Sequence, residues 1–115
     1  MILMMLALMT FWSAQLTAGE MTTKCQIISI KSWTELAIQW RGRELIAFAS
    51  WCSSCKQKII AARATPEAVV FLSVFEDPTT SEAALTRLKI TAPCVASEDL
   101  AAALGVKSLP WSQKI

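Results

Sequence analysis

The sequence contains no histidine and no tyrosine. Histidine is the usual base beside a nucleophilic serine or cysteine, and it is the commonest protein ligand for metal ions. Its absence excludes Ser-His and Cys-His catalytic pairs and every metal site that needs an imidazole. Any chemistry in this chain must therefore come from other side chains.

Charged residues are sparse, and neither sign dominates. The 115 residues include 11 Lys and Arg against 9 Asp and Glu, so the net charge is +2, and only 17% of the residues are charged. The basic residues are scattered, whereas a surface that binds phosphate backbones needs them clustered. We therefore expect no nucleic-acid partner.

The N-terminal segment is strongly apolar. A run from Ile2 to Trp12 is followed by small and polar residues, with cleavage points after Ala14 or Ala18, a pattern typical of an export signal. The run is short for a helix that spans a bilayer. An uncleaved anchor and a buried helix of the fold stay open as alternatives. We predict that residues 1–18 are a signal peptide or membrane anchor and that the chain is exported.

Four cysteines, Cys25, Cys52, Cys55 and Cys94, carry the chemistry. Export would place them in an oxidising compartment where disulfides persist, which favours a redox role. Zinc would need four ligands, and a single Cys52-Ser53-Ser54-Cys55 motif with two isolated cysteines makes an incomplete set. Metal binding is the weakest of the interpretations, and no cofactor is predicted.

Hydrophobic patterning predicts alternating strands and helices over residues 24–115. Strands are expected at 25–30, 44–50, 68–77 and 92–97, and helices at 32–40, 53–64, 80–90 and 98–104. Ser32 and Ser97 are the expected N-caps of the first and last helices, and Gly105 is the expected stop of the last. The alternation indicates an α/β domain, in which the apolar run at 44–50 is a central strand.

The Cys-Ser-Ser-Cys motif falls between a buried strand and a helix. A thiolate attacks disulfides, so a redox cysteine needs surroundings that favour the anion, and the N-terminus of a helix provides them. If the helix begins at Ser53, Cys52 is its N-cap and Cys55 lies one turn further on. Cys52 is then the predicted nucleophile, and Cys55 is the predicted resolving thiol.

The residues FASWCSSCK, together with GVKSLP downstream, resemble thioredoxin-fold thiol-disulfide oxidoreductases, closest to the exported TlpA type. The resemblance runs from about Lys24 to Pro110 and implies a three-layer α/β/α fold with Cys52 and Cys55 as catalytic residues. It also implies that Trp51 flanks the site and that Leu109 and Pro110 help to bind substrate, Pro110 as a cis proline. The implied partners are protein thiols and disulfides and a membrane redox donor or acceptor, in the periplasm or facing it from a membrane anchor.

The chain departs from that family in three places. Ile46 occupies the position where thioredoxins often bury an acid, and the Ser-Ser pair between the cysteines leaves the redox direction open. The sequence also ends five residues after Pro110. The resemblance therefore implies that the C-terminal β-hairpin and helix are missing, which would leave the strand at 44–50 with an open edge. Self-association through that edge is one expectation, and a truncated chain without independent activity is the alternative function.

The other two cysteines and three further tryptophans lie outside the motif. Cys25 and Cys94 are either two buried thiols or a structural disulfide, since the resemblance places their strands toward the same side of the sheet. Trp33 and Trp40 are at helical spacing and are expected to pack on a helix face. Trp111 either lines the substrate groove or belongs to a divergent tail.

Overall fold

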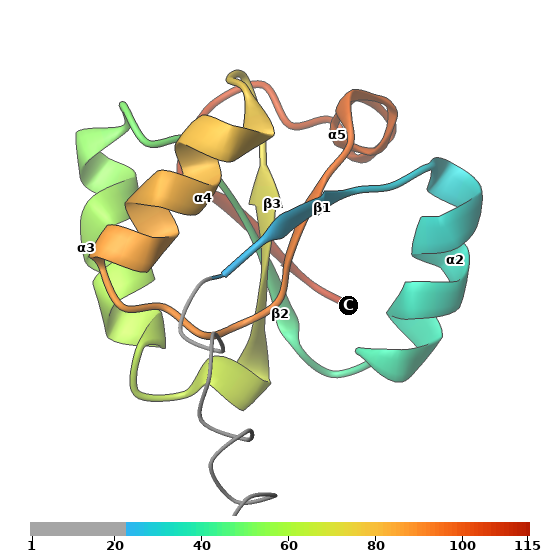
Figure 1. The fold of residues 1–115 in the computed structure, drawn as a ribbon. Helices are drawn as coiled ribbons and strands as arrows, with labels where there is room; N and C mark the ends of the chain where they lie inside the picture. Colours follow the sequence, from blue (N-terminus) through green and yellow to red (C-terminus); the bar gives the residue numbers. More distant parts are fainter. Residues whose placement is uncertain (1–22) are drawn as a thin grey trace, which may run out of the picture.

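The structure is a computed structural model that describes residues 23–115, so the predicted signal or anchor at 1–18 lies outside the described residues. In the described part, five strands form one sheet and four α-helices pack on it (Figure 1). The elements are β1 (Cys25–Ile27), α2 (Ile30–Gln39), β2 (Glu44–Phe48), α3 (Ser53–Ala62), the 3-10 helix η1 (Pro66–Ala68), β3 (Val69–Ser73), α4 (Pro78–Arg87), β4 (Cys94–Ala96), α5 (Glu98–Leu104) and β5 (Trp111–Lys114). The predicted α/β class is confirmed.

The strand order in the sheet is β1-β4-β3-β2-β5. The first four strands are parallel, and β5 runs antiparallel to β2. Because parallel strands end at the same edge of a sheet, the C-terminal ends of β1, β4, β3 and β2 share one edge. The chain that follows β2 carries Cys52, so the Cys-Ser-Ser-Cys motif lies at this edge.

The prediction that β2 has an open edge is wrong. Trp111–Lys114 forms β5 and pairs with β2, with Trp111 opposite Ala47 and Lys114 opposite Glu44. Val70 and Leu72 of the neighbouring strand β3 are also fully buried. The four residues of β5 carry no strong strand pattern, so pairing with β2 rather than local propensity produces this strand.

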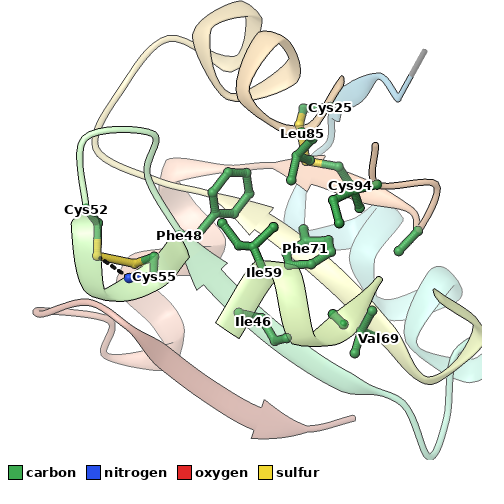
Figure 2. Packing of buried hydrophobic residues seen from close by; sticks show 13 residues of the cluster. Cys25, Ile46, Phe48, Cys52, Cys55, Ile59, Val69, Phe71, Leu85 and Cys94 are labelled. Carbon is green, nitrogen blue, oxygen red and sulfur yellow. Dashed lines mark hydrogen bonds between the residues drawn. A yellow bond between two sulfur atoms is a disulfide. The ribbon is translucent and has the colours of Figure 1, made fainter. Parts of the chain in front are cut away.

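Helices cover both faces of the sheet. On one face, α3 and α4 bury a cluster that includes Phe48, Phe71, Ile59 and Leu85 (Figure 2). On the other face, α2 and α5 cover a second cluster built on alternate residues of the same strands, namely Leu45, Ala47, Val70, Leu72, Val95, Leu100 and Ala101. The side chains of a strand alternate between the two faces of a sheet, so the continuous apolar runs in β2 and β3 fill both cores.

Capping residues set the ends of the helices. Helix α2 begins earlier than predicted, because the Oγ atom of Ser29 accepts the backbone N–H of Ser32 at 3.1 Å and makes Ser29 the N-cap. The predicted caps of α5 are confirmed: the Oγ atom of Ser97 accepts the N–H of Leu100, and Gly105 ends the helix in the left-handed conformation with φ 75°. No helix within residues 23–115 is long and apolar enough to cross a bilayer.

Candidate active site

Cys52 occupies the turn between β2 and α3. Its backbone N–H donates to the carbonyl of Ala49 at 3.1 Å, and its own conformation is extended, with φ −85° and ψ 102°. The Sγ atom of Cys52 accepts the backbone N–H of Cys55 at 3.1 Å (Figure 2). The prediction that Cys52 is the N-cap of this helix is confirmed, and the sulfur takes the place of the usual capping oxygen.

Cys52 and Cys55 are joined in a disulfide, with 5.3 Å between their Cα atoms. Their accessibilities differ: 8% of Cys52 is exposed, and Cys55 is completely buried. Cys52 is therefore the more accessible of the two cysteines. Their roles as nucleophile and resolving thiol stay predictions.

The surroundings of the Cys52 sulfur favour a negative charge. The Cys55 N–H points at it, and the hydroxyl of Ser54 lies 3.5 Å away. Both groups belong to the first turn of α3, where unpaired N–H groups and the helix dipole stabilise anions. Ile46 is buried and apolar in the same cluster as both cysteines. Stabilisation of the anion here comes from the helix terminus.

A groove of about 380 Å³ opens beside Cys52. It lies between the Cys52 turn, α3 and α4, and its lining includes Trp51, whose side chain is 63% exposed. Cys52 lines the groove and Cys55 does not. The structure thus brings the predicted flanking residue Trp51 together with the predicted nucleophile.

Leu109 and Pro110 are placed differently. Neither residue lines the groove beside Cys52. Leu109 is partly buried and packs against both core clusters, one of which contains Cys52 and Cys55. Pro110 follows a cis peptide bond, is exposed and directly precedes β5. Their role in binding substrate stays a prediction.

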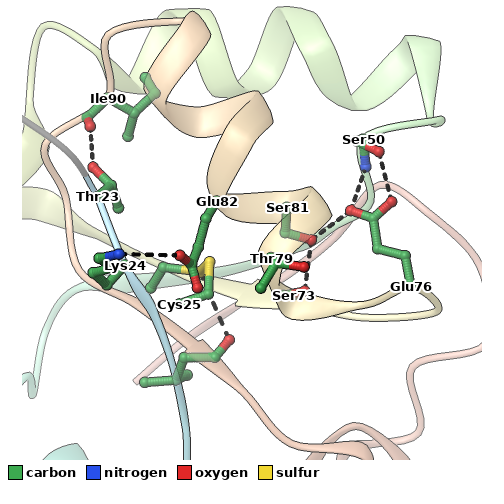
Figure 3. The surroundings of a disulfide bond; sticks show 12 residues. Thr23, Lys24, Cys25, Ser50, Ser73, Glu76, Thr79, Ser81, Glu82 and Ile90 are labelled. Carbon is green, nitrogen blue, oxygen red and sulfur yellow. Dashed lines mark hydrogen bonds and ion pairs between the residues drawn. A yellow bond between two sulfur atoms is a disulfide. The ribbon is translucent and has the colours of Figure 1, made fainter.

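Glu76 holds the turn that leads to Cys52. This residue was not predicted from the sequence to belong to the site. Its carboxylate accepts the backbone N–H of Ser50 at 2.8 Å and the Ser50 hydroxyl at 2.6 Å (Figure 3). It also accepts the hydroxyl of Ser81, which is fully buried and hydrogen-bonded to Ser73 at 2.6 Å. Glu76 therefore ties the end of β3 and the start of α4 to the turn two residues before Cys52.

Cys25 and Cys94 form the second disulfide of the structure. They lie opposite each other on the parallel strands β1 and β4, with 4.5 Å between their Cα atoms, and each is only 4% exposed. Two further contacts hold the same end of the chain: Thr23 donates to the carbonyl of Ile90, and Lys24 pairs with a carboxylate oxygen of Glu82 at 3.9 Å (Figure 3). The buried position of this disulfide suits a structural role.

Other features lie outside this site. A larger cavity of about 450 Å³ lies between the end of β3 and α5, and no cysteine lines it. Trp111 packs in the core cluster under α2 and α5 with Trp33 and Trp40 and does not line the groove beside Cys52. Within residues 23–115, no group of three His, Cys, Asp or Glu side chains is arranged to hold a metal ion.

No model of a known protein family matches the chain, and a search of curated proteins finds no relative. The functional assignment therefore rests on the geometry of the Cys52–Cys55 pair and its surroundings.

Proposed function

We propose that this protein is a thiol-disulfide oxidoreductase that exchanges disulfides with protein substrates through Cys52 and Cys55. One observation carries the proposal: a disulfide at a helix N-terminus, in which Cys52 lines a groove and its sulfur accepts a backbone N–H, whereas Cys55 is fully buried and does not line the groove. That combination supplies a stabilised attacking thiolate and a protected resolving thiol.

We further propose a thioredoxin-like fold of the TlpA type. The proposal is supported by the parallel strand β2, which leads into the redox motif, by the antiparallel strand β5 beside it, and by helices on both faces of the sheet. The segment with α4 and β4 adds a parallel strand between β3 and β1.

The exchange would proceed in two displacements when the protein acts as a reductant. The Cys52 thiolate attacks one sulfur of a substrate disulfide, a mixed disulfide forms, and the second substrate sulfur leaves as a thiolate that takes a proton from water. The Cys55 thiol then loses its proton to solvent and attacks the Cys52 sulfur. This attack breaks the bond between Cys52 and the first substrate sulfur, which leaves as a thiolate and takes a proton, and it restores the Cys52–Cys55 disulfide. The substrate gains two electrons as two thiols, and a dithiol donor must reduce the protein again.

The reverse direction, oxidation of substrate dithiols, uses the same atoms. The direction follows from the difference between the reduction potentials of the Cys52–Cys55 pair and its partners, so a measured potential assigns it. We propose an exported location, in the periplasm or at a membrane facing it, with a membrane donor or acceptor as redox partner. The buried Cys25–Cys94 disulfide supports an oxidising compartment.

A trapping experiment tests the proposed function. In Cys55→Ser the second displacement is blocked, so the full chain should accumulate mixed disulfides with protein substrates that contain a disulfide, visible on non-reducing gels. The matched variant Cys52→Ser keeps the buried cysteine and should trap nothing. In an insulin-reduction assay the unmodified chain should accelerate precipitation, and both variants should not. Absence of turnover and of trapping would favour the alternative, a thioredoxin-like chain without independent activity.

A further inference from the structure

We infer that the groove beside Cys52 selects disulfide substrates whose polypeptide carries acidic residues next to the reacting cysteine. This inference rests on the proposed function, because it names the substrate class for the same site. The occupant is a short peptide segment with an apolar side chain, a carboxylate and a disulfide within reach of the Cys52 sulfur.

The floor of the groove is apolar. Ile59 of α3 contributes to it, and so do Ala84 of α4 and Leu88, the C-cap of that helix. The exposed side chain of Trp51 also lines the groove. The volume, about 380 Å³, falls at the lower end of the range for ligand pockets. A groove of this size and lining accommodates a short peptide segment with one apolar side chain next to the disulfide.

The charge of the groove has a single sign. Lys56 on α3 and Arg87 in the last turn of α4 line it, and both are exposed. No Asp or Glu side chain is among its lining residues. Neither cation takes part in the two ion pairs found within residues 23–115, which join Lys24 to Glu82 and Lys58 to Glu44. Two cations at one apolar groove attract carboxylates and repel ammonium groups.

The two cations reach the groove from different helices. Lys56 is four residues after Cys52, one turn up the helix that Cys52 caps. Arg87 approaches from α4, which belongs to the segment between β3 and β4. Substrate selection in this groove is therefore divided between the helix that carries the redox pair and the helix that faces it.

The test compares two synthetic peptides that carry the same fluorophore-labelled disulfide and the same apolar neighbour. One has two Glu residues beside the cysteine and the other has two Lys. The full chain is reduced, freed of reductant and mixed with excess peptide, and the initial rate is divided by the rate that the neutral dithiol dithiothreitol gives with the same peptide. This division removes the effect of the charges on the intrinsic reactivity of the disulfide.

We expect the Glu peptide to react roughly three- to tenfold faster than the Lys peptide after normalisation, the range for two partly exposed charge pairs. The ratio should fall toward one at high salt, because the charges face solvent. Arg87→Glu and Lys56→Glu should each lower or reverse the ratio. Lys31→Glu, an equal change of net charge on α2 at the opposite face of the sheet, should leave it unchanged.

The outcomes separate the two proposals. Equal normalised rates for the two peptides would overturn the inference and leave the proposed oxidoreductase function intact. The same conclusion would follow if Lys31→Glu changed the ratio of the two rates as much as Arg87→Glu does. Reduction of neither peptide by the unmodified chain would overturn the oxidoreductase itself, and the inference with it.

Discussion

Reduction of the Cys25–Cys94 disulfide should remove about 4 kcal/mol from the free energy of unfolding. The two cysteines are 69 residues apart in sequence, and closing a loop of that length in the unfolded chain costs about 4 kcal/mol of conformational free energy at 25 °C. A domain of this size has a net stability of about 5 to 15 kcal/mol. The loss is therefore a large part of the total, and the reduced protein should be only marginally folded.

The measurement needs a background in which no other disulfide changes. The variant Cys52→Ala with Cys55→Ala removes the redox pair, so oxidised and reduced samples of one sequence differ only in the Cys25–Cys94 bond. Because both cysteines are almost fully buried, reduction is carried out in denaturant before refolding. With a urea dependence of about 1 to 1.5 kcal/mol per molar, the unfolding midpoint should fall by about 3 M at an unchanged slope.

A different result would refute the reasoning. If oxidised and reduced samples unfold within about 0.5 M urea of each other, either the bond does not form in solution or the unfolded chain already retains the contact between the two strands. A mass measurement after alkylation under denaturing conditions distinguishes these explanations, because a bonded pair takes up no label.

Four further predictions follow from single side chains. In the reduced protein at neutral pH, Cys52 should be alkylated faster than Cys55, since Cys52 lines the groove and keeps 8% exposure whereas Cys55 is completely buried; peptide mapping after brief iodoacetamide treatment measures this, and equal labelling would remove the assigned roles. Glu76→Ala should lower the free energy of unfolding by about 1 to 3 kcal/mol through the loss of its charged hydrogen bonds, and Glu76→Gln should lower it less, as urea titration would show. Leu85→Ala should cost about 2 to 5 kcal/mol, because the side chain is fully buried and leaves a cavity; a loss below 1 kcal/mol would contradict the packing described. Hydrogen bonds from the backbone and side chain of Thr79 lower the pKa of Asp77 below its usual 3.8. The ionised carboxylate therefore contributes to stability above pH 3.8, and this contribution is lost as the pH falls through the lower pKa of the folded state. The difference in thermal midpoint between the unmodified chain and Asp77→Ala should accordingly shrink from pH 7 to pH 2.5.

The fold class and the redox turn could be predicted because their signals are local. Each signal lies within a few neighbouring residues. The signals are the long apolar runs of β2 and β3, the Cys52 cap before α3, and the serine and glycine caps of α5. The error at Ser32 is of the same local kind: two serines three residues apart both suit a cap, and the backbone turns at Ser29.

Features that join distant parts of the chain could not be predicted in the same way. β5 forms because the edge of β2 has backbone groups free to accept and donate hydrogen bonds. The four residues of β5 do not by themselves predict a strand. The contact between Glu76 and Ser50 spans 26 residues, and Arg87 reaches the groove only because α4 packs beside α3. The pairing of Cys25 with Cys94 likewise depends on the placement of β4 next to β1, which the sequence analysis could name only as one of two alternatives.

The position of the Cys25–Cys94 bond has a mechanical consequence. A force applied to the polypeptide before Cys25 and after Cys94 passes directly through the two sulfur atoms and bypasses the 69-residue separation between them. Fully extended, that part of the chain would be roughly 230 to 250 Å long, and it cannot be stretched while the bond is intact. Cys52 and Cys55 lie inside it, so the redox turn is shielded from tension, whereas β5 lies outside and can be peeled away from β2. In a single-molecule pulling experiment, the hidden length should appear only after reduction.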